Sequence, residues 1–151
     1  AHHGRLVGLA RLLVDDVPTA EDVVQEAFTS LYQRWPRLRD PNAALSYLQT
    51  SVLNGARSSL RHRRIALARP AERPGILPSA EQTAVRHEVY RELISSLAQL
   101  PGRQREVLVL RYYLDLSEAE IANTLVISRG SVKKHASRAL NTLSIRLEAA
   151  R

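Results

Sequence analysis

Hydrophobic positions recur at the three- and four-residue spacing of α-helices through most of the chain. Leu6, Leu9, Leu12 and Leu13 form the first stripe, which ends in the segment from Asp15 to Pro18. Two further stripes predict helices that turn the following residues inward: Val24, Ala27, Phe28, Leu31 and Trp35 in one, and Leu45, Leu48, Val52, Ala56 and Leu60 in the other. Thr19 followed by Asp22 resembles a capping box, so Thr19 is the expected N-cap of the second helix. The first part of the chain is therefore expected to be a bundle of three to four helices.

Residues 67–80 interrupt this pattern. They contain Pro70, Pro74, Gly75 and Pro78 and show no helical period, which is typical of a linker. We therefore predict an all-α fold with two small helical domains, residues 1–66 and 85–151, joined by a flexible linker at 67–84.

The second half predicts a helix-turn-helix. One helix with Val85, Val89, Leu93, Leu97 and Leu100 is followed by another around 107–113. The segment Ser117-Glu118-Ala119-Glu120 is a capping box before a short helix at 121–125, and Ser128 is the expected N-cap of a longer helix. The residues expected where these two helices touch are Ile121, Ala122, Leu125, Ile127 and Val132.

The outward side of the longer helix is a candidate DNA-binding face. It carries Ser128, Arg129, Ser131, Lys133, Lys134, His135 and Arg138. A helix fits the major groove of B-DNA, where Arg129 is placed to reach a guanine and Lys133, Lys134 and Arg138 to reach phosphates. A solvated basic helix is the alternative interpretation, and the lack of acidic residues from 129 to 146 argues against it.

The charge distribution points to two kinds of partner. The net charge is +7, five acidic residues lie between 15 and 26, and residues 54–69 and 129–146 each hold five basic residues and no acid. Twenty of the 22 basic residues are Arg, which a GC-rich genome also explains. The chain contains no Met, so we also expect natural residues before Ala1.

The composition argues against several other classes of protein. The chain contains no Cys, which excludes disulfides and Cys-ligated zinc. Its histidines lack metal-ligand spacing apart from the terminal His2-His3 pair, and no Gly-rich phosphate loop is present. No apolar segment approaches the roughly 20 residues of a membrane span. We expect no enzymatic activity, catalytic residue, cofactor, metal or membrane insertion, and a cytoplasmic location.

Three segments of the second half, 100–113, 116–122 and 127–133, resemble the C-terminal domain of ECF sigma factors, which reads the −35 promoter element. The run Leu-Pro-Gly-Arg-Gln-Arg-Glu-Val at 100–107 is the most specific part of this resemblance. Val126 departs from the family, which usually has Gly in this turn. Since the turn often needs a positive φ, Val126 implies either another turn shape or about 1–2 kcal/mol of strain.

The first half supports the same resemblance. Residues 20–28 are similar to the family's polymerase-binding helix, whose exposed face docks on the β′ clamp helices. Asp22, Gln25 and Glu26 share one helical face at spacings of three and four residues. The alternative, that acids favour a helix N-terminus, explains Asp22 but not Gln25. The resemblance also assigns −10 recognition to the loop at 36–42 and the next helix, through Arg39, Asp40, Asn42, Asn54, Arg57, Arg61 and Arg64.

The resemblance implies an alternative sigma factor that directs promoter-specific transcription initiation. Its expected partners are core RNA polymerase, through the β′ clamp helices and the β flap, and promoter DNA. An anti-sigma factor is a further partner of the family that this sequence neither shows nor excludes, and the resemblance also implies an actinobacterial source. The linker is then expected to let the two domains close around an inhibitor or open onto polymerase. Two alternatives stay open: a stand-alone helix-turn-helix regulator that dimerises on operator DNA, and a helical protein-interaction module. A stand-alone regulator binds duplex DNA by itself, with affinity that falls steeply with salt.

Overall fold

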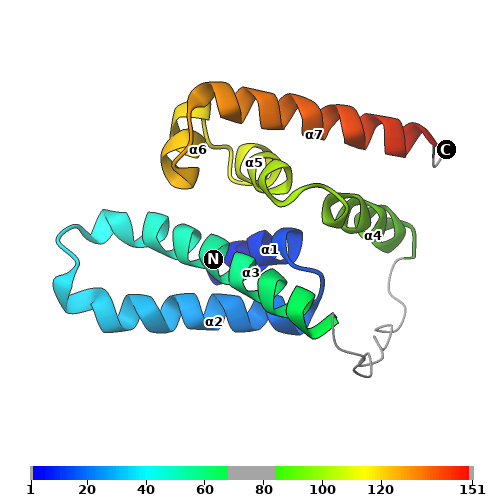
Figure 1. Cartoon of the computed structure of the whole chain (residues 1–151). Coiled ribbons are helices and arrows are strands. Elements are labelled where there is room, and N and C mark those ends of the chain that lie inside the picture. The colour runs from blue at the N-terminus through cyan, green and yellow to red at the C-terminus, as the bar shows by residue number, and fades with distance from the viewer. Residues whose placement is uncertain (1, 68–83, 150–151) are drawn as a thin grey trace.

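The computed structural model describes residues 2–67 and 84–149, and most of these residues are helical, as predicted. The first half consists of α1 (His2–Leu13), α2 (Val17–Arg34) and α3 (Ala44–Leu67), with two 3₁₀ turns, η1 (Trp35–Arg37) and η2 (Pro41–Ala43), between α2 and α3. Figure 1 shows α2 and α3 side by side, with the turns at one end. The predicted helical bundle is confirmed.

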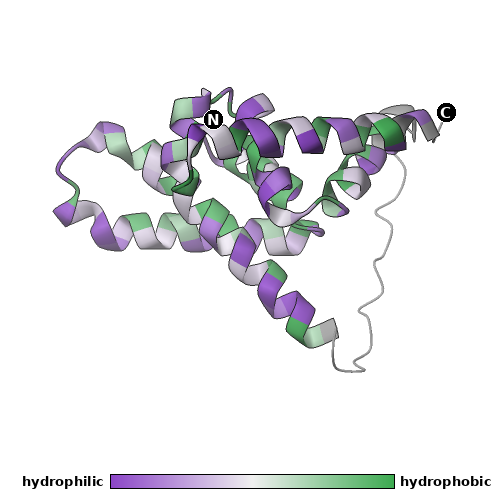
Figure 2. Cartoon of the chain, turned by 45° about the horizontal axis from the view of Figure 1, so that its top comes forward, coloured by the Kyte–Doolittle hydropathy of each residue, from purple (hydrophilic) through white to green (hydrophobic). Residues whose placement is uncertain are grey.

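The second half contains α4 (Ala84–Ala98), α5 (Gly102–Tyr112), α6 (Glu118–Leu125) and α7 (Arg129–Ala149). The short α6, a tight turn and the long α7 form the predicted helix-turn-helix (Figure 1). Hydrophobic and hydrophilic residues alternate along the helices, as the colours of Figure 2 show. The predicted linker, 67–84, falls almost entirely on residues 68–83, which lie outside the described part of the chain.

The start of α2 differs from the sequence prediction. Asp16, not Thr19, is the N-cap, because its carboxylate accepts a hydrogen bond from the backbone N–H of Thr19 at 2.8 Å. Pro18 lies in the first turn, where a missing N–H costs nothing. The Thr19 hydroxyl donates a second hydrogen bond to the Asp16 carboxylate. Thr19, the predicted N-cap, thus helps to hold the side chain of the observed N-cap, Asp16.

Most hydrophobic residues predicted to point inward do so. The exceptions are Trp35 and Leu45, which are exposed; Val89 and Leu93, on the hydrophobic stripe of α4, are exposed as well. Trp35 lies beyond the end of α2, in η1, where the helical period no longer sets its direction. Leu45 lies in the first turn of α3. The inward assignments of Trp35 and Leu45 were wrong.

The two halves pack directly against each other. Helix α1 contacts α2 and α3 of its own half and also α4 and α5 of the other, and buried side chains of both halves form one continuous apolar cluster. Leu9 and Val14 from the first half and Val107 and Leu110 from the second are almost completely buried in it. The expected N-terminal and C-terminal surfaces are therefore held in a defined relation to each other in this structure.

Candidate nucleic-acid interface

The acidic side of α2 is exposed and lies opposite the buried side of that helix. Asp22, Gln25 and Glu26 are all exposed, whereas Val23 and Val24 are buried in the core. Because the helix is anchored by its apolar side, the three polar side chains are presented together on a rigid element. The structure thus confirms that these residues share an exposed face, which is suited to a basic partner.

The loop between α2 and α3 is built from the two 3₁₀ turns. The Asp40 side chain caps η2 by accepting a hydrogen bond from the backbone N–H of Asn42 at 2.9 Å. Arg39, Asp40 and Asn42 are exposed together at this end of the bundle. Asp40 therefore shapes the loop, and Arg39 and Asn42 are the members of the set with side chains available to a ligand.

Two exposed aromatic residues next to this loop were not predicted. Tyr32 is 83% exposed and Trp35 is 53% exposed, although Trp35 was expected to point inward. Exposed rings beside cationic side chains are typical platforms for unpaired bases. The sequence does carry one signal for Trp35: Pro36 directly follows it, and a helix usually ends before proline.

The basic side of α3 is divided between exposed and engaged residues. Asn54, Arg61 and Arg64 are exposed, as a DNA-binding role requires. Arg57 instead binds Glu106 of the second half through two charge-assisted hydrogen bonds, Nε to Oε1 at 2.6 Å and Nη2 to Oε2 at 2.7 Å. The hydrogen bond to Glu106 raises the pKa of Arg57, against the opposing effect of partial burial.

Arg63 was not predicted as a functional residue, and the structure gives it a local partner. Its guanidinium lies 3.6 Å from a carboxylate oxygen of Asp15 and 3.3 Å from one of Asp16. These contacts tie the last turns of α3 to the start of α2. Two of the five acids in the 15–26 cluster thus serve the bundle and do not belong to the exposed acidic face.

The helix-turn-helix has the local geometry that the sequence predicts. Ser117 and Glu120 form both hydrogen bonds of the capping box at the start of α6. The Ser128 hydroxyl oxygen accepts a bond from the backbone N–H of Ser131 at 3.1 Å and so caps α7. Ile121 and Val132 are completely buried between the helices. These contacts fix the direction of α7 relative to α6.

Val126 occupies the turn in the left-handed conformation, with φ 56° and ψ 50°. Its side chain is 87% exposed, so no packing compensates the unfavourable backbone. Of the two possibilities that the sequence left open, the structure shows strain and not another turn shape. A β-branched residue in this conformation costs about 1–2 kcal/mol relative to one that adopts it freely.

The candidate DNA-binding side of α7 is largely exposed. Arg129, Lys133, Lys134 and Arg138 are exposed, together with Ser128. Ser131 and His135 are half-buried, and Nδ1 of His135 is buried without a hydrogen-bond partner among the described residues. His135 therefore fits the proposed DNA face less well than its neighbours. Lys133 lies 3.9 Å from Glu118, which also approaches Arg111 at 3.6 Å.

Other site types have little support in the described residues. Within 2–67 and 84–149, no group of three or more His, Asp or Glu residues is arranged to hold a metal ion. None of the helices described here is both long and apolar enough to span a bilayer.

Comparison with known proteins decides the family. The sigma-70 region 2 profile matches residues 1–65, and the sigma-70 region 4 profile matches residues 90–143. The chain is 32% identical over 143 residues to the RNA polymerase sigma-E factor of Streptomyces avermitilis, covering 95% of this chain and 79% of that protein. It is 30% identical over 138 residues to the ECF RNA polymerase sigma factor SigM of Mycobacterium tuberculosis, covering 91% and 69%. The chain belongs to the ECF sigma factors.

Further relatives and solved structures agree with this family. A probable RNA polymerase sigma factor of Xanthomonas campestris, RfaY, is 32% identical over 145 residues, but this chain spans only 36% of its length. The sigma factor RpoE of Bartonella quintana, solved with the anti-sigma factor NepR, superposes with a TM-score of 0.76 at 22% identity over 99% of this chain and 94% of that chain. CnrH, solved with the cytosolic domain of CnrY, gives a TM-score of 0.72 at 26% identity over 99% and 84%. The relatives come from several bacterial groups, so the actinobacterial source stays a prediction.

The two matched regions contain every surface described above. Region 2 spans the acidic side of α2, the 3₁₀ loop and the basic side of α3 up to residue 65. Region 4 spans α5, the helix-turn-helix and most of α7. This ECF sigma factor therefore presents its candidate polymerase-binding and DNA-binding residues on two separate family regions, with the Arg57–Glu106 pair between them.

Proposed function

We propose that this ECF sigma factor binds core RNA polymerase and directs it to promoters by recognising the −10 and −35 elements. The observation that carries the proposal is the coexistence of an exposed acidic face in region 2 and an exposed basic recognition helix in region 4. A protein that only binds DNA has no use for the first, and a protein-interaction module has no use for the second. In this role it is an initiation factor and not a catalyst.

The acidic face of α2 is the proposed polymerase contact. Asp22, Gln25 and Glu26 offer two carboxylates and an amide to basic residues of the β′ clamp helices. The buried side chains Val23, Val24 and Ala27 fix the helix on the core. Binding to polymerase therefore costs little additional conformational entropy. A second polymerase contact is proposed on α4 and α7, where Val89, Leu93, Leu140 and Ile145 are exposed apolar side chains suited to the β flap.

The end of the bundle near the 3₁₀ turns is the proposed −10 site. Arg39 and Asn42 can bond the polar edges of an unstacked base, in a loop whose shape Asp40 fixes. Tyr32 and Trp35 supply the stacking surface. Asn54, Arg57, Arg61 and Arg64 extend this surface along α3 and are proposed to hold the same strand by its backbone.

The N-terminal turns of α7 are the proposed −35 site. Arg129 is positioned to read a guanine edge in the major groove, and Lys133, Lys134 and Arg138 to bond phosphates. The Ser128 hydroxyl bonds the hydroxyl and the backbone N–H of Ser131. The proposed DNA contacts of Ser128 and Ser131 therefore use the hydrogen-bonding positions of the two hydroxyls that these bonds leave free. His135 is the last residue of the proposed set and is half-buried at the edge of this surface.

The remaining proposals concern organisation and regulation. We assign residues 1–66 to polymerase binding and −10 recognition, 67–84 to the linker and 85–151 to −35 recognition, in a cytoplasmic protein. An anti-sigma factor is a proposed partner, since the similar RpoE and CnrH chains were solved with the anti-sigma factor NepR and with CnrY, respectively. The linker is proposed to let the halves close around such an inhibitor or open onto polymerase.

The test combines the purified chain with core RNA polymerase from a GC-rich bacterium and selects genomic fragments that yield run-off transcripts. We expect transcripts with a shared motif upstream of their starts, and loss of these transcripts with Asp22→Ala plus Glu26→Ala. Glu148→Ala, which removes an exposed carboxylate near the end of α7, is the control and should transcribe normally. No transcription, together with tight duplex binding by the chain alone, would instead establish a stand-alone regulator.

A further inference from the structure

The contact between the two halves contains a buried arginine that completes a helix of the other half. Arg105 of α5 is only 4% exposed. Its Nε donates to the carbonyl oxygen of Leu12 at 2.8 Å and its Nη2 to that of Val14 at 3.3 Å, while Nη1 lies 3.5 Å from Asp15. The last carbonyls of a helix have no intrahelical donor, so Arg105 caps α1 from outside. Burial lowers the pKa of Arg105, and Asp15 opposes that shift.

The next residue, Glu106, makes the second contact across the halves. Its carboxylate is held by Arg57 of α3 in the two-bond geometry described above, and Arg103 lies 3.4 Å away on the same side of α5. Arg57 is a proposed phosphate-binding residue, and a carboxylate offers an arginine the same paired oxygens as a phosphate. In this structure Glu106 therefore uses the two Arg57 donors, Nε and Nη2, that a phosphate would need in the role proposed for Arg57.

A third contact fixes how closely α1 approaches the end of α5. The Tyr113 hydroxyl donates to the carbonyl oxygen of Arg5 at 2.8 Å, and Arg5 reaches back to the carbonyl of Tyr113 at 3.4 Å. Gly8 faces this ring: a Cβ at residue 8 would overlap the Tyr113 hydroxyl and lie 3.0 Å from its Cζ. Burial raises the pKa of Tyr113. The absence of a side chain at Gly8 is thus required for the halves to meet in this way.

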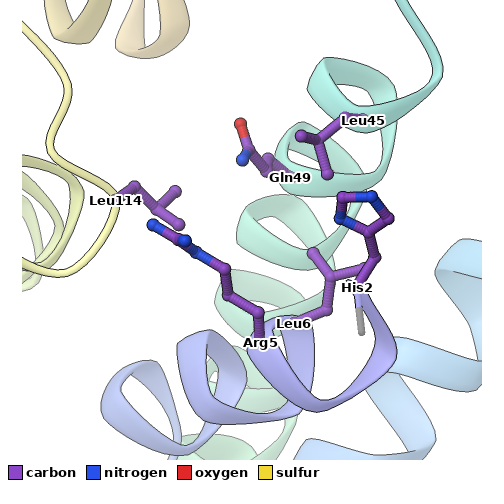
Figure 3. A pocket seen from close by; sticks show the side chains of 6 residues that line it. All are labelled: His2, Arg5, Leu6, Leu45, Gln49 and Leu114. Atoms are coloured by element: carbon purple, nitrogen blue, oxygen red, sulfur yellow. The ribbon is translucent and has the colours of Figure 1, made fainter.

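The contact has the character of one that can separate. Beside Arg5 it leaves a cavity of about 230 Å³, lined by His2, Arg5, Leu6, Leu45, Gln49 and Leu114. Figure 3 shows Leu114 and Gln49 on opposite sides of this cavity, with the Arg5 side chain directed toward Leu114. The contact also buries apolar side chains such as Leu9 and Val107, but polar groups and this cavity interrupt it, as in domain pairs that move relative to each other. The two buried charged residues of α5, Arg105 and Glu106, would gain water as a partner if the halves parted.

We propose that Arg105 and Glu106 form a latch that closes the free chain on itself and covers Arg57 until polymerase or DNA displaces it. The proposal rests on the proposed DNA-binding role of Arg57. The closed form needs no inhibitor, because every contact of the latch comes from this chain. Arg105 holds the two halves together by capping α1. Glu106 neutralises only Arg57 among the proposed −10 residues of α3 and leaves Asn54, Arg61 and Arg64 exposed.

The first measurement is the distance between the halves in the free, full-length chain. The chain has no Cys, so Ser46→Cys and Asn141→Cys, at exposed positions in α3 and α7, give the only two labelling sites for fluorescence energy transfer. Glu106→Gln preserves the shape of the side chain and removes the charge that Arg57 binds. We expect a roughly tenfold or larger rise in the ratio of open to closed molecules, the size expected when one partner of a desolvated charge pair is removed.

Gly8→Ala tests the same closure without altering any charge or any proposed DNA contact. Alanine is the better helix former, so α1 itself is not weakened, but the added Cβ collides with Tyr113. We expect this variant to open the chain, and Tyr113→Phe in the same chain to restore part of the closure. The control Glu92→Gln makes the same charge change as Glu106→Gln at an exposed position of α4 and should stay closed. Circular dichroism checks that each variant remains helical.

The second measurement is binding of a labelled single-stranded DNA of random sequence by the free chain. We expect Glu106→Gln to bind more tightly than Glu92→Gln, by roughly threefold to tenfold, since a freed arginine adds a phosphate contact. Adding Arg57→Gln to Glu106→Gln should abolish the gain. Unchanged distances in both Glu106→Gln and Gly8→Ala would refute the latch. Longer distances with no gain over Glu92→Gln would refute the covering of Arg57, whereas a failure of the proposed function would show only in the run-off assay.

Discussion

The basic side of α3 and the basic side of α7 carry similar residues but are in different states. On α3, Arg57 is engaged by Glu106 and Arg63 by Asp15 and Asp16. On α7, the only ion pair in the described part of the chain is the long contact of Lys133 with Glu118. The recognition helix therefore meets solvent with most of its cations uncommitted, while part of the α3 surface is already satisfied by the protein itself.

This difference is informative because the two surfaces have different proposed targets. Duplex DNA at a −35 element presents its phosphates without prior melting, so a ready-made basic helix is sufficient to bind it. A −10 strand must first be unpaired, which requires polymerase. A surface proposed to act only after polymerase binding can have one of its arginines covered in the free chain without loss, and Glu106 pairs with Arg57 of that surface. The same charge composition thus supports an open site and a conditional one.

The largest expected effect is a loss of unfolding free energy on substitution of a core residue, and it tests whether the two halves unfold as one unit. Ile121 is completely buried between α6 and α7. Ile121→Ala should lower the free energy of unfolding by about 2–5 kcal/mol, and Ile121→Val by about 0.5–1.5 kcal/mol. If the shared apolar cluster couples the halves, urea denaturation followed by circular dichroism and by Trp35 fluorescence will shift together. A shift of the helical signal alone would show that the halves unfold independently.

The second prediction contrasts the two arginines directly. Arg129→Ala should weaken binding of a selected promoter duplex by the free chain by about 1–3 kcal/mol, because Arg129 is exposed and is the residue proposed to read the groove. Arg57→Ala should leave DNA binding by the free chain nearly unchanged, because Glu106 already occupies that guanidinium. In the holoenzyme, Arg57→Ala should lower open-complex formation, measured by permanganate reactivity of the melted strand. Equal losses for both variants in the free chain would remove the distinction between the two surfaces.

Much of the fold could be predicted from the sequence because its determinants are local. The Ser117–Glu120 capping box, the Ser128 cap and the burial of Ile121 and Val132 depend on residues close together in the chain, and all were predicted. The family resemblance also predicted the two regions that the profiles match. The exposed acidic face of α2 follows from spacing alone, since the helix has one apolar side.

The errors arise where a local pattern does not determine the outcome. Asp16 and Thr19 are both good caps, and only the position of Pro18 favours the earlier start of α2. Trp35 continues the apolar period of α2 beyond the residue where the helix ends. Arg105 and Glu106 looked like ordinary family residues, because their partners on α1 and α3 lie far away in sequence. A charged pair directly before the apolar run from Val107 to Leu110 is the one signal that could have marked them as buried.

A smaller effect is expected at the turn that orients α7. Val126→Gly should remove a left-handed strain of about 1–2 kcal/mol and add part of the entropic cost of glycine, for a net stabilisation of about 1 kcal/mol. Val126→Asn should fall between the two, since Asn tolerates this conformation. Thermal denaturation measures the order of the three midpoints. An unchanged or lower midpoint for Val126→Gly would show that Val126 is not strained, and that the turn relaxes in solution.

The smallest effect concerns the one ion pair on the recognition helix. Glu118 is near the start of α6 and approaches both Arg111 and Lys133 at distances over 3.5 Å, so Glu118→Gln should lower the free energy of unfolding by no more than about 1 kcal/mol. The same change releases Lys133, and duplex binding should tighten with a steeper dependence on salt. Glu148→Gln alters the net charge equally at an exposed position of α7 and separates this local release from a general charge effect. If both variants tighten duplex binding equally, Lys133 is as available in the native protein as its neighbours, and the recognition helix is fully open.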